Sequence, residues 1–273
     1  MGAGRRIGLI AGAGRFPFHV AQEAKRQGVA VDAVGLSGWV DPALASQVDT
    51  YEELAVGQLG RLMASLTSRG VREAVMAGKV TKQALLDQRA SLDEEARRLL
   101  AQAREVSVPA ILGAIAARLA QEGIALLDSS TFLKPNLCPV GVLTVRRPTS
   151  AEQADVQVGL SAARAIAAMD IGQTVAVKGR VVVAVEALEG TDATIRRARA
   201  LAGSGLVVVK TAAPAQDRRF DLPVVGMDTI RALQDAQAGC LAMEAGTTLL
   251  LERDALIAAA NAARLCLLGV KSV

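Results

Sequence analysis

The first half of the chain repeats one pattern, in which a short apolar run is followed by a longer amphipathic segment. The apolar runs predict strands at Ile7–Ala11, Val29–Leu36, Val71–Ala77 and Ile124–Asp128. The segments between them predict helices at Pro17–Gln27, Leu54–Ser68, Leu92–Glu105 and Pro109–Glu122. Strands that alternate with helices form a parallel sheet covered by helices on both faces. The expected fold class is therefore α/β, with a Rossmann-like parallel sheet in an N-terminal domain.

The second half follows a different pattern after Pro135, Pro139 and Pro148. We expect the N-terminal domain to span residues 1–130, a linker 131–148, and a mixed α/β domain with hairpins 149–273. Thr149 and Glu152 predict a capping box at the start of a helix. The remaining expected elements are helices at Ala151–Met169, Thr191–Ala202, Asp228–Ala238 and Arg253–Ala263, strands at Leu206–Lys210 and Leu265–Val270, and hairpins at Thr174–Glu186 and Glu244–Leu251.

Composition narrows the range of partners and chemistry. Only 2% of the residues are aromatic, which removes the stacking surface that proteins use to bind single-stranded nucleic acid. The 31 Lys and Arg residues against 27 Asp and Glu form no dense basic tract, so nucleic acid is not an expected partner. The single histidine, His19, rules out a His-rich zinc site and leaves one imidazole for any Ser- or Cys-based nucleophile.

The sequence also carries expectations about cellular location. No apolar run approaches the ~20 residues that cross a bilayer, and the basic start at residues 1–6 lacks the apolar segment of a signal peptide. Cys138, Cys240 and Cys266 lie far apart and are odd in number, which indicates reduced thiols rather than a disulfide framework. We therefore expect a cytoplasmic protein.

Two glycine turns mark the carboxyl ends of predicted strands. Gly12 and Gly14 lie between the first strand and the following helix, and Gly78 ends a later strand of the same sheet. Ligands collect at this edge of parallel sheets, where backbone N–H groups and a helix N-terminus can receive a phosphate. A tight turn without a ligand explains the glycines equally well. A nicotinamide site is less favoured, because Leu36-Ser37-Gly38 stands where a ribose-binding acid would be expected.

Charged residues concentrate in two later segments. Glu186, Glu189 and Asp192 lie at the start of a predicted helix, ahead of an arginine-rich stretch that begins at Arg196. Carboxylates for a cation beside arginines for phosphate oxygens suit a pyrophosphate site. The alternative is a solvated first turn stabilised by the helix dipole and capped by Thr191.

The second segment is a polar loop between the strand that ends at Lys210 and the apolar stretch that starts at Pro223. It contains Gln216 and Asp221. Asp221 stands between Phe220 and Leu222, where partial desolvation would suit a base or a metal ligand. A turn-forming aspartate is the competing interpretation.

At these residues the chain resembles the LpxI family of UDP-2,3-diacylglucosamine diphosphatases, and the resemblance covers nearly the whole chain. It rests on Gly8–Gly14 with Pro17, Ala77–Val80, Asp170–Gln173, Val185–Ala187, Glu189–Asp192, and Lys210, Pro214, Gln216, Asp221, Pro223 and Gly226. The chain departs from the family pattern at Lys79, where relatives can carry Asn, and at Ala213, where relatives often carry a second lysine.

The resemblance implies a Rossmann-like N-terminal domain, a catalytic C-terminal domain and a substrate held between them. It implies Mg²⁺-dependent hydrolysis of UDP-2,3-diacylglucosamine to UMP and 2,3-diacylglucosamine 1-phosphate (lipid X), a step of lipid A biosynthesis. Asp221 matches the essential aspartate of the family. On this basis Asp221 is the expected catalytic residue. The expected metal ligands are Asp221, Glu189 and Asp192, and the expected substrate-binding residues are Gly12, Gly14, Gly78, Thr191, Lys210 and Gln216, with Arg196 as a further phosphate contact.

Two other functions stay open from the residues alone. One is a nucleotide-binding regulatory protein without hydrolase activity, and the other is an NAD(P)-dependent oxidoreductase. The resemblance also calls for an apolar crevice for two acyl chains, which the helical regions Leu92–Glu122 and Ala151–Met169 could provide, although packing in the protein core is the favoured interpretation of both. The mild basic excess is compatible with a peripheral contact at the inner membrane. A homo-oligomer is left open.

Overall fold

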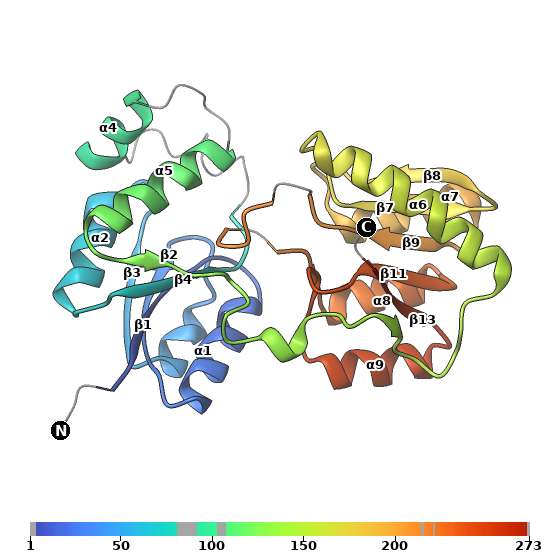
Figure 1. The fold of residues 1–273 in the computed structure, drawn as a ribbon, viewed down its shortest axis with the longest axis horizontal. Helices are drawn as coiled ribbons and strands as arrows, with labels where there is room; N and C mark the ends of the chain where they lie inside the picture. The colour runs from blue at the N-terminus through green and yellow to red at the C-terminus, as the bar shows by residue number, and fades with distance from the viewer. Residues whose placement is uncertain (1–3, 81–91, 103–107, 214–215, 221, 272–273) are drawn as a thin grey trace. The chain divides into compact units, whose positions relative to one another are not determined.

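The computed structural model describes residues 4–80, 92–102, 108–213, 216–220 and 222–271 (Figure 1). Contacts divide the chain into two compact units. The first unit comprises Met1–Leu133 with Asp217–Asp221, and the second comprises Lys134–Gln216 with Leu222–Val273. The expected linker 131–148 contributes Gly141–Val142 as a short strand to the sheet of the second unit.

A five-stranded parallel sheet forms the centre of the first unit, with strand order β3-β2-β1-β4-β5. The strands are β1 (Arg6–Ala11), β2 (Ala30–Leu36), β3 (Thr50–Leu54), β4 (Glu73–Ala77) and β5 (Ala125–Leu126). The helices are α1 (Phe16–Arg26), α2 (Leu59–Ser68), α4 (Glu94–Gln102) and α5 (Val108–Gln121), with a 3-10 turn η1 (Pro42–Gln47). Apolar residues of α2, α4 and α5 pack with the sheet in one cluster. The expected Rossmann-like parallel sheet is confirmed, and the expected helix end at Glu105 lies outside the described residues.

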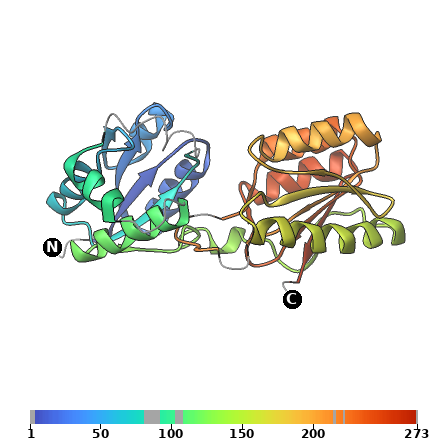
Figure 2. The same ribbon diagram turned by 90° about the horizontal axis from the view of Figure 1, so that it is seen from above.

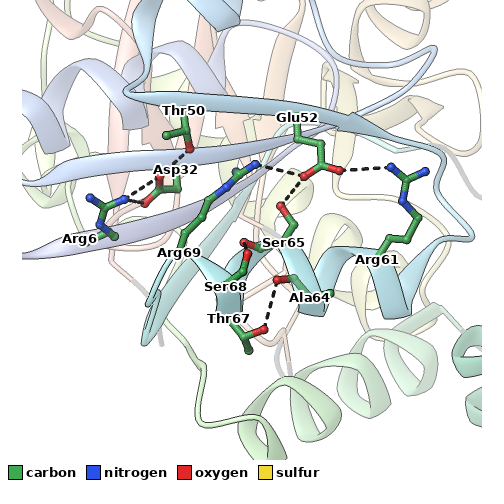
Figure 3. Close-up of polar contacts among 10 residues, drawn as sticks. All are labelled: Arg6, Asp32, Thr50, Glu52, Arg61, Ala64, Ser65, Thr67, Ser68 and Arg69. Atoms are coloured by element: carbon green, nitrogen blue, oxygen red, sulfur yellow. Dashed lines mark hydrogen bonds and ion pairs between the residues drawn. The ribbon is translucent and has the colours of Figure 1, made fainter.

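Strand β3 was not expected, and the helix expected from Leu54 begins at Leu59 instead. The cause is that β3 is an edge strand with polar side chains, which hides the apolar pattern of a strand. Figure 3 shows how these side chains are held: Ser65 and Arg69 donate to the Glu52 carboxylate at 2.7 and 3.1 Å. Polar contacts between β3 and α2 therefore stabilise an element that hydrophobicity does not mark.

A six-stranded mixed sheet forms the second unit, with strand order β6-β13-β11-β9-β7-β8. Its strands are β6 (Gly141–Val142), β7 (Thr174–Lys178), β8 (Val181–Val185), β9 (Val207–Lys210), β11 (Cys240–Glu244) and β13 (Cys266–Val270). Strands β9, β11 and β13 are parallel, whereas β7 pairs antiparallel with β8 and β9, and β6 pairs antiparallel with β13. The expected mixed α/β architecture is confirmed.

Helices cover both faces of this sheet (Figure 2). The helices are α6 (Ser150–Ala168), α7 (Thr191–Ala202), α8 (Met227–Asp235) and α9 (Arg253–Ala262), with a 3-10 turn η3 (Lys134–Asn136) near the start of the unit. Val207 and Val209 pack in one cluster with α6, while Val208 packs in a second cluster with α7, α8 and α9. Successive strand residues point to opposite faces, so one apolar strand serves both layers.

The local turn and cap signals of the second half are mostly confirmed. Thr149 and Glu152 form the capping box, because each side chain accepts the backbone N–H of the other residue at 3.2 and 2.8 Å. Strands β7 and β8 form the expected hairpin across Gly179 and Arg180, both of which have positive φ. No helix among the described residues is long and apolar enough to cross a membrane.

The hairpin expected at Glu244–Leu251 is wrong. Strand β11 pairs with β9 and β13, so both of its edges are already occupied. Strand β12 (Leu249–Leu250) instead pairs in parallel with β10 (Val224–Val225) in a separate two-stranded sheet. Two apolar runs around a glycine look alike in sequence whether they pair with each other or with distant strands, and only the tertiary fold distinguishes the two cases.

Candidate active site

A buried lysine lies at the carboxyl end of β9 in the second unit. Lys210 is the last residue of this strand, is 7% exposed and stands opposite Thr174 of β7. Its Nζ donates to Oγ1 of Thr191 at 2.8 Å and of Thr174 at 3.4 Å. Buried lysines are rare unless their charge is matched, so the surroundings of Lys210 are informative.

Glu186 supplies the matching charge. Its carboxylate accepts the Thr191 hydroxyl at 2.8 Å and the backbone N–H of Gln173 at 3.2 Å. Burial raises the pKa of Glu186, but the positive charge of Lys210 and the hydrogen bonds from Thr174, Thr191 and Gln173 outweigh burial and bring it below its usual value. The Thr191 hydroxyl therefore bridges the Lys210 amine and the Glu186 carboxylate.

The position of Thr191 corrects one expectation. The cap of α7 is Gly190, with φ of +82°, and no side chain caps this helix. The hydroxyl of Thr191 instead lies between Lys210 and Glu186. A threonine at a helix start looks like a cap in sequence, yet here Lys210 at the end of β9 and Glu186 just before the helix are its partners.

The other expected carboxylates are engaged separately. Glu189 is exposed and pairs with Arg197 at 2.6 Å, and hydrogen bonding to this arginine holds the pKa of Glu189 below its usual value. Asp192 accepts the Thr229 hydroxyl at 3.2 Å, and Arg196 is exposed. No group of three or more His, Cys, Asp or Glu residues within the described ranges could hold a metal ion. Glu189 and Asp192 are two of the three expected ligands, and the third is not among the described residues.

The loop after Lys210 is only partly described. Gln216 accepts the backbone N–H of Ala213 with its Oε1 and donates its own N–H to the Ala213 carbonyl, both at 3.0 Å. This pairing joins Ala213 to Gln216. Thr211 is fully buried, and its Oγ1 has no hydrogen-bond partner among the residues that the structure describes. Asp221 lies outside the described residues.

The glycine turns of the first unit come together as expected. Ala13 and Lys79 exchange two backbone hydrogen bonds of 2.9 Å, which join the ends of β1 and β4. A Cβ on Gly12 would lie 2.7 Å from the Lys79 carbonyl oxygen, and one on Gly78 would lie 2.7 Å from the Gly12 carbonyl carbon. Close backbone approach alone therefore requires these two glycines. Gly14 has φ of +92° and open space around its Cβ position.

Polar groups at the end of β5 were not singled out from the sequence. Asp128 accepts the Ser130 backbone N–H at 2.7 Å and pairs with Arg218 at 3.0 Å. Ser129 donates its hydroxyl to the Met76 carbonyl at 2.8 Å and its backbone N–H to the Arg218 carbonyl at 2.9 Å. The signal was the polar run 128–131, which begins at the last residue of a predicted strand. These contacts anchor residues 217–220 to the carboxyl edge of the first sheet.

The acid of β2 argues against a nicotinamide site. Asp32 is fully buried in the strand, where it accepts two hydrogen bonds from Arg6 at 2.7 and 2.9 Å and one from Thr50 at 2.5 Å (Figure 3). It does not stand at the end of β2, where a ribose-binding acid would be placed. Its role is to join three strands.

These features define a two-unit α/β protein. Its first unit is Rossmann-like, and its second unit carries a lysine–glutamate pair at the carboxyl end of strand β9. The family model for the LpxI N-terminal domain matches residues 6–135, and that for the LpxI C-terminal domain matches residues 139–268. The UDP-2,3-diacylglucosamine pyrophosphatase LpxI of Caulobacter vibrioides is 32% identical over 281 residues, covering 97% of this chain and 98% of that protein. The chain belongs to the LpxI family.

A solved structure of a glycinamide-RNase-transformylase T from Mycobacterium tuberculosis also matches, with 18% identity. The match covers 67% of this chain and 44% of that one at a TM-score of 0.25. A likeness this weak supports no argument about function.

Proposed function

We propose that this chain hydrolyses the pyrophosphate bond of UDP-2,3-diacylglucosamine to UMP and 2,3-diacylglucosamine 1-phosphate, a step of lipid A biosynthesis. The observation that carries the proposal is the end-to-end match to a relative named for this substrate. The two LpxI domain models support it by covering both units of the chain.

The described residues suit this chemistry. Hydrolysis of a pyrophosphate requires neutralised phosphoryl oxygens and an oriented water, and it needs no covalent nucleophile. Lys210 offers an ammonium held in a fixed direction by Thr174 and Thr191. Because the Thr191 hydroxyl that accepts from Lys210 itself donates to Glu186, the ammonium is oriented before an anion binds. We assign Lys210 and Thr191 to the phosphate oxygens.

Asp221 remains our proposed catalytic residue, as the group that orients the attacking water or binds a cation. Magnesium, when bound, would supply positive charge to the pyrophosphate. We retain Glu189 and Asp192 as further ligands, although each has a protein partner of its own. Gly12, Gly14, Gly78 and Gln216 remain proposed substrate contacts. Peripheral membrane contact and a homo-oligomer also remain predictions.

The test is incubation of the purified chain with UDP-2,3-diacylglucosamine in detergent micelles, followed by mass analysis of the products. We expect UMP and the diacylglucosamine phosphate in equal amounts, and loss of turnover with EDTA that added Mg²⁺ reverses. Reaction in ¹⁸O-water identifies the phosphorus atom attacked. Binding without UMP release would overturn the hydrolase proposal and favour the nucleotide-binding regulatory protein.

A further inference from the structure

We propose that Glu244 is a positioning residue that fixes the main chain directly after Lys210; this rests on the proposed function. Glu244 is the last residue of β11, the strand next to β9. It is 5% exposed, although it carries a carboxylate. Buried carboxylates persist when partners hold them, and removal of a partner is costly.

The contacts of Glu244 connect three elements of the second unit. Its Oε2 accepts the backbone N–H of Ala212 at 3.0 Å, and its Oε1 lies 3.4 Å from Nη2 of Arg164. Arg164 comes from α6, the helix that packs on β7 and β9 (Figure 2). The carboxylate therefore ties the residue that follows β9 to a neighbouring strand and to a covering helix.

Hydrogen bonds hold three consecutive residues where β9 ends, from Lys210 to Ala212. Lys210 is bound through its side chain by Thr191, and Thr211 donates its backbone N–H to the Gln173 carbonyl at 2.9 Å. Ala212 is bound by Glu244. Preformed donors stabilise a developing charge only when they stay in place, and a displacement of about 1 Å can cost about 100-fold in rate. Glu244 contributes by holding the backbone, since a carboxylate itself would repel a pyrophosphate.

The opposite end of the same sheet offers a matched control. Glu152 accepts the backbone N–H of Thr149 at 2.8 Å and pairs with Arg146 at 2.6 Å. Arg146 in turn donates to the carbonyl of Gly239, the residue before β11. This pair has the same chemistry as Glu244 with Arg164, but it lies at the amino end of β11.

The experiment compares Glu244→Ala with Glu152→Ala by steady-state kinetics and amide hydrogen exchange. We expect Glu244→Ala to lower kcat about tenfold or more with KM within about threefold, and Glu152→Ala to leave kcat within about twofold. Exchange in a peptide that contains Ala212 should quicken about tenfold only in Glu244→Ala. Glu244→Gln, which keeps an acceptor for Ala212, should restore most of kcat.

Equal kcat values for the two alanine variants, with unchanged exchange at Ala212, would overturn the proposal. If Glu244→Ala does not fold, Glu244→Asp and Glu152→Asp take their places, because the shorter side chain withdraws the carboxylate from its partner. Exchange at Ala212 needs no substrate. If the wild type releases no UMP, the proposed function fails, and exchange at Ala212 still decides whether Glu244 holds the backbone.

Discussion

Replacement of Lys210 by Met removes a buried charge while nearly preserving the volume of the side chain. The hydrogen bonds from Lys210 to Thr191 and from Thr191 to Glu186 measure 2.8 Å each, so the two charged atoms are at most twice that distance apart. At an effective dielectric constant of about 20 and a separation of about 5 Å, their attraction is about 3 kcal/mol. We expect Lys210→Met to lower the free energy of unfolding by about this amount near neutral pH.

The effect of pH has a defined sign. The folded state lowers the pKa of Glu186, so its ionised form stabilises the fold above the pKa of the unfolded chain, and this contribution is lost as pH falls through the folded pKa. In Lys210→Met the lysine charge no longer opposes the burial of Glu186, so the pKa of Glu186 is higher than in the wild type. The difference in stability between wild type and variant therefore shrinks as the pH falls through the Glu186 pKa of the variant toward that of the wild type.

The assay is urea unfolding followed by circular dichroism, at about pH 7 and about pH 4, for Lys210→Met, Glu186→Gln and the double variant. The double-mutant cycle should give a coupling of about 3 kcal/mol at neutral pH and under about 1 kcal/mol in acid. A coupling near zero at neutral pH would refute the reasoning, because it would mean that water already screens the pair.

Three further predictions follow from single residues. Asp221→Ala should lower turnover about 100-fold or more while substrate binding is retained, and turnover near the wild-type rate in product assays would remove Asp221 from the mechanism. Gly14→Ala should lower the free energy of unfolding by about 1 kcal/mol because of the positive φ of Gly14. Gly78→Ala should lower it by at least about 2 kcal/mol more, because the added Cβ would meet backbone atoms. Equal shifts in the melting temperatures of the two variants would contradict this. Burial raises the pKa of Cys138 to about 11, so iodoacetamide at about pH 8 should label it about 100-fold more slowly than a free thiol. Peptide mass mapping measures the labelling, and a rate equal to that in urea would contradict the burial of Cys138.

Elements defined by local signals were well predicted from the sequence. Helix α7 spans Thr191–Ala202 as expected, because an apolar stripe and flanking glycines mark it. The capping box at Thr149 and the β7–β8 hairpin are also local, since their partners lie a few residues apart. The Rossmann-like order of the first sheet follows from the repeated alternation of strand and helix.

The sequence predicted which residues belong to the candidate site, but not which of them contact one another. Lys210 and Thr191 were both expected to bind substrate, yet nothing local in the sequence shows that the end of β9 and the start of α7 meet through their hydrogen bond. From sequence, Glu244 marks only the start of an expected hairpin. Whether Asp221, Glu189 and Asp192 act on one cation stays a prediction.

Periodicity, caps and turns depend on residues within a few positions of each other, so the chain alone determined its helices, most of its strands and its α/β class. The edge strand β3, the pairing of β12 with β10, and the burial of Lys210 and Glu244 were decided only by tertiary structure. The physical reason is that a polar side chain becomes buried, charged and oriented only when a distant segment supplies its partner. In contact with water, the same carboxylate would be an ordinary surface residue.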